Sequence, residues 1–322
     1  MSRDGLRLSV TLLSVLPEFI VPAARRDGQR SGPGHADPAR ATRAGRYTVP
    51  ATADLPGDLG GPPWGDAEPP VPESQANGPR PAGAAPARQT AAEAMLWAPL
   101  VGLVLGVIAA AVLYVSGHLL HTGSLVAAVL AVGSLAVLSR GLHLDGLADL
   151  ADGLGSRRPA AGALEVMRRS DIGPFGVVTL VLTLLVQVAG LTQADAAGRG
   201  VPAVIVAAVT GRLAITWACR RGVPSARPDG LGAMVADSVA PVSATVLTGA
   251  AVAVTVGGIF LAAAVAAVPL EWILPVALGA GLVGGVALGE HAARRLGGVT
   301  GDVLGAVSEA ATAACLLVTA IS

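Results

Sequence analysis

Residues 173–194 read GPFGVVTLVLTLLVQVAGLTQA and contain no charged side chain. A helix needs about 20 consecutive apolar residues to cross the hydrocarbon core of a bilayer. This stretch has that length, and its polar side chains are only threonine and glutamine. It therefore predicts a transmembrane helix.

Similar apolar stretches occur along most of the chain. The composition agrees with them, because 52% of the residues are hydrophobic and only 14% are charged, which lies outside the usual range for a soluble domain. We expect an all-α fold, a polytopic integral membrane helical bundle with about seven transmembrane helices. The predicted spans lie at about 97–115, 122–138, 173–194, 201–218, 243–268, 272–288 and 303–321.

Arginine is concentrated in alternate connections between these spans. The connections at 139–172, 219–242 and 289–302 hold several arginines each, whereas the others hold only Arg199. Short cytoplasmic loops collect positive charge, so we place these three loops in the cytoplasm. The chain is then predicted to be a multi-pass protein of the cell (plasma) membrane, with a cytoplasmic N-terminus and an active site that faces the cytoplasm.

The first ninety residues differ in composition from the rest of the chain. Residues 1–24 contain an apolar block that Pro17 and Glu18 interrupt, which favours a short interfacial or re-entrant helix over a secretory signal, since no small-residue cleavage site is evident. Residues 25–90 are rich in Pro, Gly, Ala and Arg and have few large aliphatic side chains, so we predict a disordered insert. Residues 91–322 are predicted to form the membrane catalytic domain.

Three carboxylates recur in the run LHLDGLADLADG at residues 142–153. Asp145, Asp149 and Asp152 stand at i, i+4 and i+7, so on a helix they share one face, where like charges repel. A divalent cation would relieve that repulsion, and Mg²⁺ is the hard ion that carboxylates and substrate phosphates share. The alternative is a water-facing loop whose aspartates cap a helix. His143 is a candidate base, although a single histidine is more often structural.

A second acidic pair opens the last span. Asp302 and Glu309 are also i and i+7. Asp302 alone could be an N-cap. Glu309 lies roughly two turns inside the span, where an ionisable side chain is by default a functional candidate.

Arginines near these acids are candidates for binding an anionic substrate. Arg212, Thr216 and Arg220 follow i, i+4 and i+8 and form a polar stripe toward the cytoplasm, although Arg212 could instead snorkel to the interface. Arg227 lies in a turn and could pair with phosphate oxygens through both guanidinium nitrogens.

The segment before residue 173 is a further candidate. Ser170 and Asp171 stand where a helix is expected to begin, a place at which anions bind favourably. The arginine pair beside them could simply belong to the positive-inside signal. Together, the acidic face, the arginines and the cytoplasmic loops are typical of a phosphoryl-transfer site.

Four motifs resemble the cobalamin synthase family of adenosylcobinamide-GDP ribazoletransferases, in consistent order over residues 91–322. They are the run at 142–153, Glu165–Phe175, Ala226–Gly232 and Gly298–Gly305. The chain departs from the family pattern at Arg169-Ser170-Asp171, where many members have Asp-Ser-Arg.

This resemblance implies an integral membrane enzyme that joins adenosylcobinamide-GDP to α-ribazole, or to its 5′-phosphate, and releases GMP. It implies Mg²⁺ as the cofactor, a lipid bilayer as the surroundings and no nucleic acid as a partner, and leaves open whether the chain forms a homo-oligomer. Carried onto this sequence, the metal would be held by Asp145, Asp149, Asp152, Asp302 and Glu309.

Two other classes of protein remain as alternatives. Asp149–Gly153 with Arg157 resembles the start of the sequence signature of CDP-alcohol phosphotransferases. The later aspartates of that signature do not follow at the required distance. A cation or solute transporter could use the same intramembrane acids, although no repeat relates the two halves of the chain.

Overall fold

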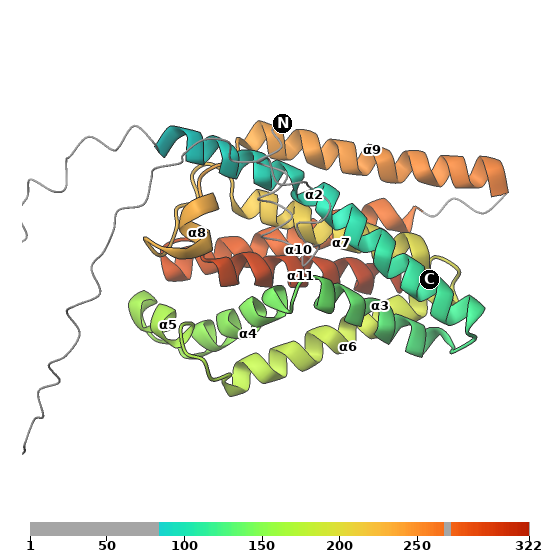
Figure 1. Ribbon diagram of the computed structural model, residues 1–322, viewed down its shortest axis with the longest axis horizontal. Coiled ribbons are helices and arrows are strands. Elements are labelled where there is room, and N and C mark those ends of the chain that lie inside the picture. Colours follow the sequence, from blue (N-terminus) through green and yellow to red (C-terminus); the bar gives the residue numbers. More distant parts are fainter. Residues whose placement is uncertain (1–83, 267–271, 322) are drawn as a thin grey trace, which may run out of the picture. The chain divides into compact units, whose positions relative to one another are not determined.

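The computed structural model describes residues 84–266 and 272–321, and every regular element in these ranges is a helix. The predicted all-α class is therefore confirmed (Figure 1). The elements are α2 (Ala84–Tyr114), its π-helical continuation η3 (Val115–Leu119), α3 (Ser124–Leu138), α4 (Leu142–Gly155), α5 (Ala160–Val166), α6 (Pro174–Ala196), α7 (Gly200–Ala218), α8 (Gly230–Val235), α9 (Pro241–Ala266), α10 (Ile273–Leu296) and α11 (Gly301–Thr319).

The predicted multi-pass membrane bundle is confirmed as well. In the described ranges, six helices are long and apolar enough to cross a membrane, namely α2 with η3, α6, α7, α9, α10 and α11. The predicted span at 122–138 corresponds to α3, which has only 15 residues. It reaches the length of a span only together with α4, from which it is bent by 87°.

The N-terminal boundary of the membrane bundle differs from the prediction. Helix α2 begins at Ala84, upstream of residue 91, because the alanine-rich segment before the span continues the helix. The end of the predicted insert at 25–90 therefore belongs to α2. The predicted interfacial helix at 1–24 and the rest of the insert lie outside the described residues.

Large apolar side chains cover the outer surface of the bundle. Leu185 on α6, Val254 on α9 and Val283 on α10 are all exposed, which suits helices that face lipid. Helix α11 lies inside the bundle, where it packs against α10, α7, α4 and α6 (Figure 1). The elements that bear the predicted acids are thus in direct contact.

The bend between α3 and α4 comes from two residues with left-handed backbone conformation. Arg140 has a φ of 57° and Gly141 a φ of 68°. The N–H of Gly141 donates to the carbonyl oxygen of Ala136 at 2.8 Å, which closes the end of α3. The chain then starts α4 in a new direction, and α4 packs against α11 and α6.

Candidate functional site

Helices α4 and α11 approach so closely that their backbones touch at two glycines. A Cβ atom at Gly146 would lie 2.7 Å from the carbonyl oxygen of Asp302, and one at Gly305 would lie 3.0 Å from the backbone of His143. Only glycine allows this approach without a shift of the helices. The crossing brings the start of the acidic run beside the first turn of α11.

A cavity of about 220 Å³ lies at this crossing. Its polar groups come from Asp145 and His143 on α4 and from Asp302 on α11. His143 is buried, and its Nδ1 atom has no hydrogen-bond partner among the described residues. The rest of the lining is apolar or glycine: Met95, Leu142, Ile215, Leu231, Val235, Gly301, Leu304 and Gly305.

Arg227 reaches Asp302 because the turn after α7 pairs with the segment before α11. The N–H of Val299 donates to the carbonyl oxygen of Pro224 at 2.9 Å, and the N–H of Ala226 donates to the carbonyl oxygen of Val299 at 3.0 Å. The Nη1 atom of Arg227 then lies 3.4 Å from Oδ2 of Asp302. Its Nη2 atom donates to the carbonyl oxygen of Leu164 at 2.9 Å.

Negative charge exceeds positive charge around Asp149. The carboxylates of Asp145, Asp302 and Asp152 act on it, and the guanidinium of Arg227 opposes them. Asp302 is not the N-cap of α11, because the hydroxyl of Thr300 accepts from the N–H of Val303 at 3.3 Å and fills that role. The carboxylate of Asp302 lines the cavity, and its Oδ2 accepts a hydrogen bond from the hydroxyl of Thr300 at 3.2 Å.

The donor set fits a hard divalent cation. In the described ranges, no three His, Cys, Asp or Glu side chains lie close enough to hold an ion alone. Mg²⁺ rarely needs such a cage, since it is usually bound by one or two carboxylates together with substrate phosphates and water. Asp145 and Asp302 face one cavity from two helices and provide this kind of site.

Asp152 has a different role in the structure from the other two aspartates of its stripe. Its Oδ2 accepts from the N–H of Gly173 at 2.7 Å, and its Oδ1 accepts from the N–H of Gly176 at 2.9 Å. These amides open α6, where a negative charge is favourable, and Pro174 between them has no N–H to satisfy. Asp152 thus caps the start of α6.

We expect Asp152→Ala to destabilise the protein, because two amides would lose their acceptor inside the bundle. An unsatisfied buried group costs about 1–3 kcal/mol, so the variant should unfold at a lower temperature in a thermal scan. The matched change Asp171→Ala removes an exposed carboxylate from the connection before α6 and should leave the unfolding temperature unchanged. Equal unfolding temperatures for both variants would contradict the capping role.

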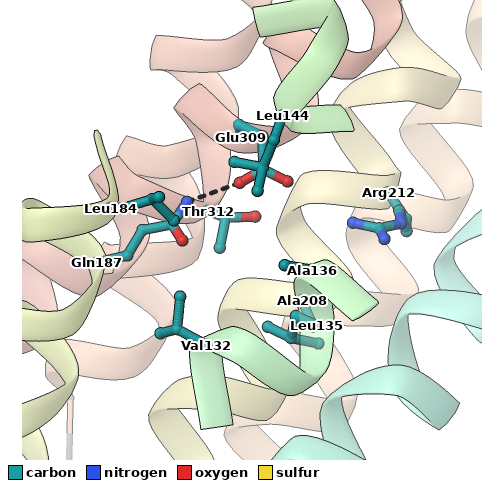
Figure 2. Close-up of a pocket in the computed structure, with 10 residues that line it drawn as sticks. All are labelled: Val132, Leu135, Ala136, Leu144, Leu184, Gln187, Ala208, Arg212, Glu309 and Thr312. Atoms are coloured by element: carbon teal, nitrogen blue, oxygen red, sulfur yellow. Dashed lines mark hydrogen bonds between the residues drawn. The ribbon is translucent and has the colours of Figure 1, made fainter. Parts of the chain in front are cut away.

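Glu309 and Arg212 lie in a separate cluster within the membrane bundle. Glu309 accepts a hydrogen bond from the side-chain amide of Gln187 at 2.8 Å, and Nη1 of Arg212 donates to the hydroxyl of Ser308 at 2.9 Å. Figure 2 shows both charged side chains around the small space that they line together with Gln187 and Thr312. Its volume is about 10 Å³, enough for roughly one water molecule.

The remaining predicted residues are not brought to the cavity. Arg220 forms an ion pair with Glu290 on α10 and also donates to the carbonyl oxygen of Trp217. Ser170 and Asp171 are exposed in the connection between α5 and α6. Of the predicted residues, Asp145, His143 and Asp302 therefore line the cavity. Arg227 lies at its edge through the contact with Asp302, and Asp149 is near these charges.

Several contacts of the predicted residues could not be read from the sequence patterns. The partner of Glu309, Gln187, had a visible signal as a polar residue within a predicted span, whereas Glu290 and Leu164 had none. The apolar lining of the cavity is also invisible in the sequence, because Ile215 and Met95 look like any other residues of a transmembrane helix.

Comparison with known proteins gives a consistent result. A family model described as cobalamin-5-phosphate synthase matches residues 76–320. A Frankia casuarinae protein named adenosylcobinamide-GDP ribazoletransferase is 42% identical over 246 residues, which are 73% of this chain and 87% of that protein. Relatives of the same name from Nocardioides sp. (41% identical, 71% of this chain and 87% of the relative) and Bradyrhizobium diazoefficiens (37%, 73% and 86%) also match.

No solved structure matches the chain. The family model covers nearly the whole described bundle, including the acidic run, the turn that carries Arg227 and the start of α11. The curated relatives are enzymes, so the prediction of an enzyme is confirmed over that of a transporter. The chain belongs to the cobalamin-5-phosphate synthase family and is an enzyme of cobalamin biosynthesis.

Proposed function

We propose that this enzyme joins adenosylcobinamide-GDP to α-ribazole, or to its 5′-phosphate, in a Mg²⁺-dependent reaction that releases GMP. The observation that carries the proposal is the cavity at the α4–α11 crossing, in which Asp145, Asp302 and His143 face the same space. The names of the relatives supply the substrate class.

In this reaction a ribose hydroxyl of the acceptor attacks the phosphorus on the cobinamide side of the pyrophosphate. A new oxygen–phosphorus bond forms, the bond from that phosphorus to the bridging oxygen breaks, and GMP leaves with the bridging oxygen. The attacking hydroxyl must lose its proton. His143 is the proposed acceptor of this proton, because it lines the cavity and its buried Nδ1 atom has no hydrogen-bond partner among the described residues.

In this proposal the aspartates and Arg227 would bind the pyrophosphate in different ways. Asp145 and Asp302, with Asp149 beside them, would hold Mg²⁺, and the bound ion supplies charge neutralisation on the phosphate oxygens. Arg227 would exchange its weak contact with Asp302, at 3.4 Å, for phosphate oxygens of the substrate. A guanidinium can make two parallel hydrogen bonds to such oxygens.

We also propose that the cavity opens to the cytoplasmic side of the cell membrane. The arginine pairs 220–221 and 294–295 stand at the ends of α7 and α10. The turn after α7 is bonded to the segment before α11, so these arginines and the acids of the cavity lie at one end of the bundle. The positive-inside rule supports a cytoplasmic location for that end.

The test is an assay of membranes that carry the chain, supplied with adenosylcobinamide-GDP, α-ribazole and Mg²⁺. We expect GMP release that stops when EDTA removes the metal and returns when Mg²⁺ is added in excess. Membranes with the Asp145→Asn variant are the matched control. GMP release that continues in EDTA would contradict the metal dependence, and uptake of solute without GMP would contradict the reaction.

A further inference from the structure

The lining of the cavity at the α4–α11 crossing has two chemically distinct parts. Asp145, Asp302 and His143 are its polar groups. The other part consists of apolar side chains without a hydrogen-bonding group. They come from α4 and from four further helices, α2, α7, α8 and α11. The apolar wall, as we call it, consists of Met95, Leu142, Ile215, Leu231, Val235 and Leu304.

The volume of the cavity limits what can occupy it. An apolar cavity of about 150 Å³ is large enough for benzene, and drug-sized ligands need about 300–1,000 Å³. The volume here, about 220 Å³, falls between these values. It suits a fused two-ring group and is far too small for a corrinoid ring.

Three residues of the apolar wall are also held in place by burial. Met95 on α2, Ile215 on α7 and Val235 on α8 are each buried almost completely. A wall of this kind gives no partner to the amino or carbonyl groups of a purine base, and burying such groups unpaired weakens binding. It favours a base that carries only methyl groups at its outer edge.

We infer that the cavity is the acceptor site, in which the apolar wall binds the dimethylbenzimidazole ring of α-ribazole and the ribose lies toward His143 and the two aspartates. This inference rests on the proposed function. It makes Ile215 and Leu231 specificity-determining residues that select a nucleoside with an apolar two-ring base over the purine nucleosides.

The test compares two acceptors with purified full-length protein in lipid vesicles: α-ribazole and the riboside of unsubstituted benzimidazole, which lacks both methyl groups. Ile215→Phe should narrow the cavity and raise the KM for α-ribazole by about tenfold or more, with a smaller rise for the slimmer acceptor. The KM for adenosylcobinamide-GDP should not change. Leu231→Ala, which widens the cavity, should reduce the discrimination between the two acceptors.

Leu185→Phe is the matched control, because it adds the same ring to a lipid-facing position on α6 and should change neither KM. Equal rises for both acceptors in Ile215→Phe, or a rise only for adenosylcobinamide-GDP, would overturn the inference. Equilibrium dialysis with labelled α-ribazole separates this outcome from failure of the proposed function. If the wild-type protein releases no GMP, binding that Ile215→Phe weakens still supports the acceptor site, and absence of binding overturns it.

Discussion

Changing Asp145 to asparagine is expected to lower kcat for GMP release by about 100-fold or more, the usual effect of removing one group that stabilises charge in a transition state. Asp145 is exposed at the cavity, and its carboxylate forms no hydrogen bond or ion pair with another helix in the described ranges, so its loss should not unfold the protein. An amide keeps the size of the side chain but not its negative charge. The measurement is the rate of GMP release at saturating substrates, with the unfolding temperature as a check.

The dependence on Mg²⁺ sharpens this prediction. If Asp145 helps to hold the ion, the variant should need a higher Mg²⁺ concentration for half of its maximal rate. The control is Asp195→Asn, which changes a carboxylate on α6 that does not line the cavity. An Asp145→Asn enzyme with the wild-type rate and an unchanged Mg²⁺ requirement would show that this carboxylate holds no metal.

Replacing Gly146 with alanine is expected to damage both stability and activity, although alanine is the better helix former by about 1 kcal/mol. The new Cβ atom would lie 2.7 Å from the carbonyl oxygen and 2.8 Å from the Cα atom of Asp302. Those are backbone atoms of a buried helix and cannot rotate away, so α4 and α11 must separate. Overpacking of this kind costs about 1–3 kcal/mol, and a displacement of about 1 Å in a catalytic site can cost about 100-fold in rate.

Gly133→Ala provides the matched control, because a Cβ atom there meets nothing within 4 Å. This variant of α3 should keep its activity and unfold at the same temperature or higher. The measurements are the unfolding temperature and the rate of GMP release for both variants. A Gly146→Ala enzyme as active and stable as Gly133→Ala would mean that the crossing tolerates a wider spacing.

The sequence was sufficient to predict most of the fold, because a transmembrane helix is determined by its own length and polarity. The spans predicted at 173–194 and 201–218 correspond closely to α6 and α7. The bend between α3 and α4 was not predictable in this way. It depends on the left-handed conformation of Arg140, which arginine adopts only because the end of α3 and the packing of α4 require it.

The site was predictable only in part, because periodicity shows which side chains share a face and not what that face meets. Asp145 and Asp152 belong to one stripe of α4, yet Asp152 meets the amides that open α6. Arg220 likewise meets Glu290, which is remote in sequence and gave no signal. The resemblance identified the family, whereas the partners of each side chain required tertiary structure.

The central position of α11 also bears on how the enzyme is made. In the described ranges α11 is the final helix to leave the ribosome, yet it supplies Asp302 and one side of the cavity. Its neighbours α4, α6 and α7 are synthesised earlier, and α11 must then pack against all three. A chain that stalls before residue 301 therefore contains the whole acidic run of α4 but lacks one side of the cavity, so the proposed activity requires that α11 has been made.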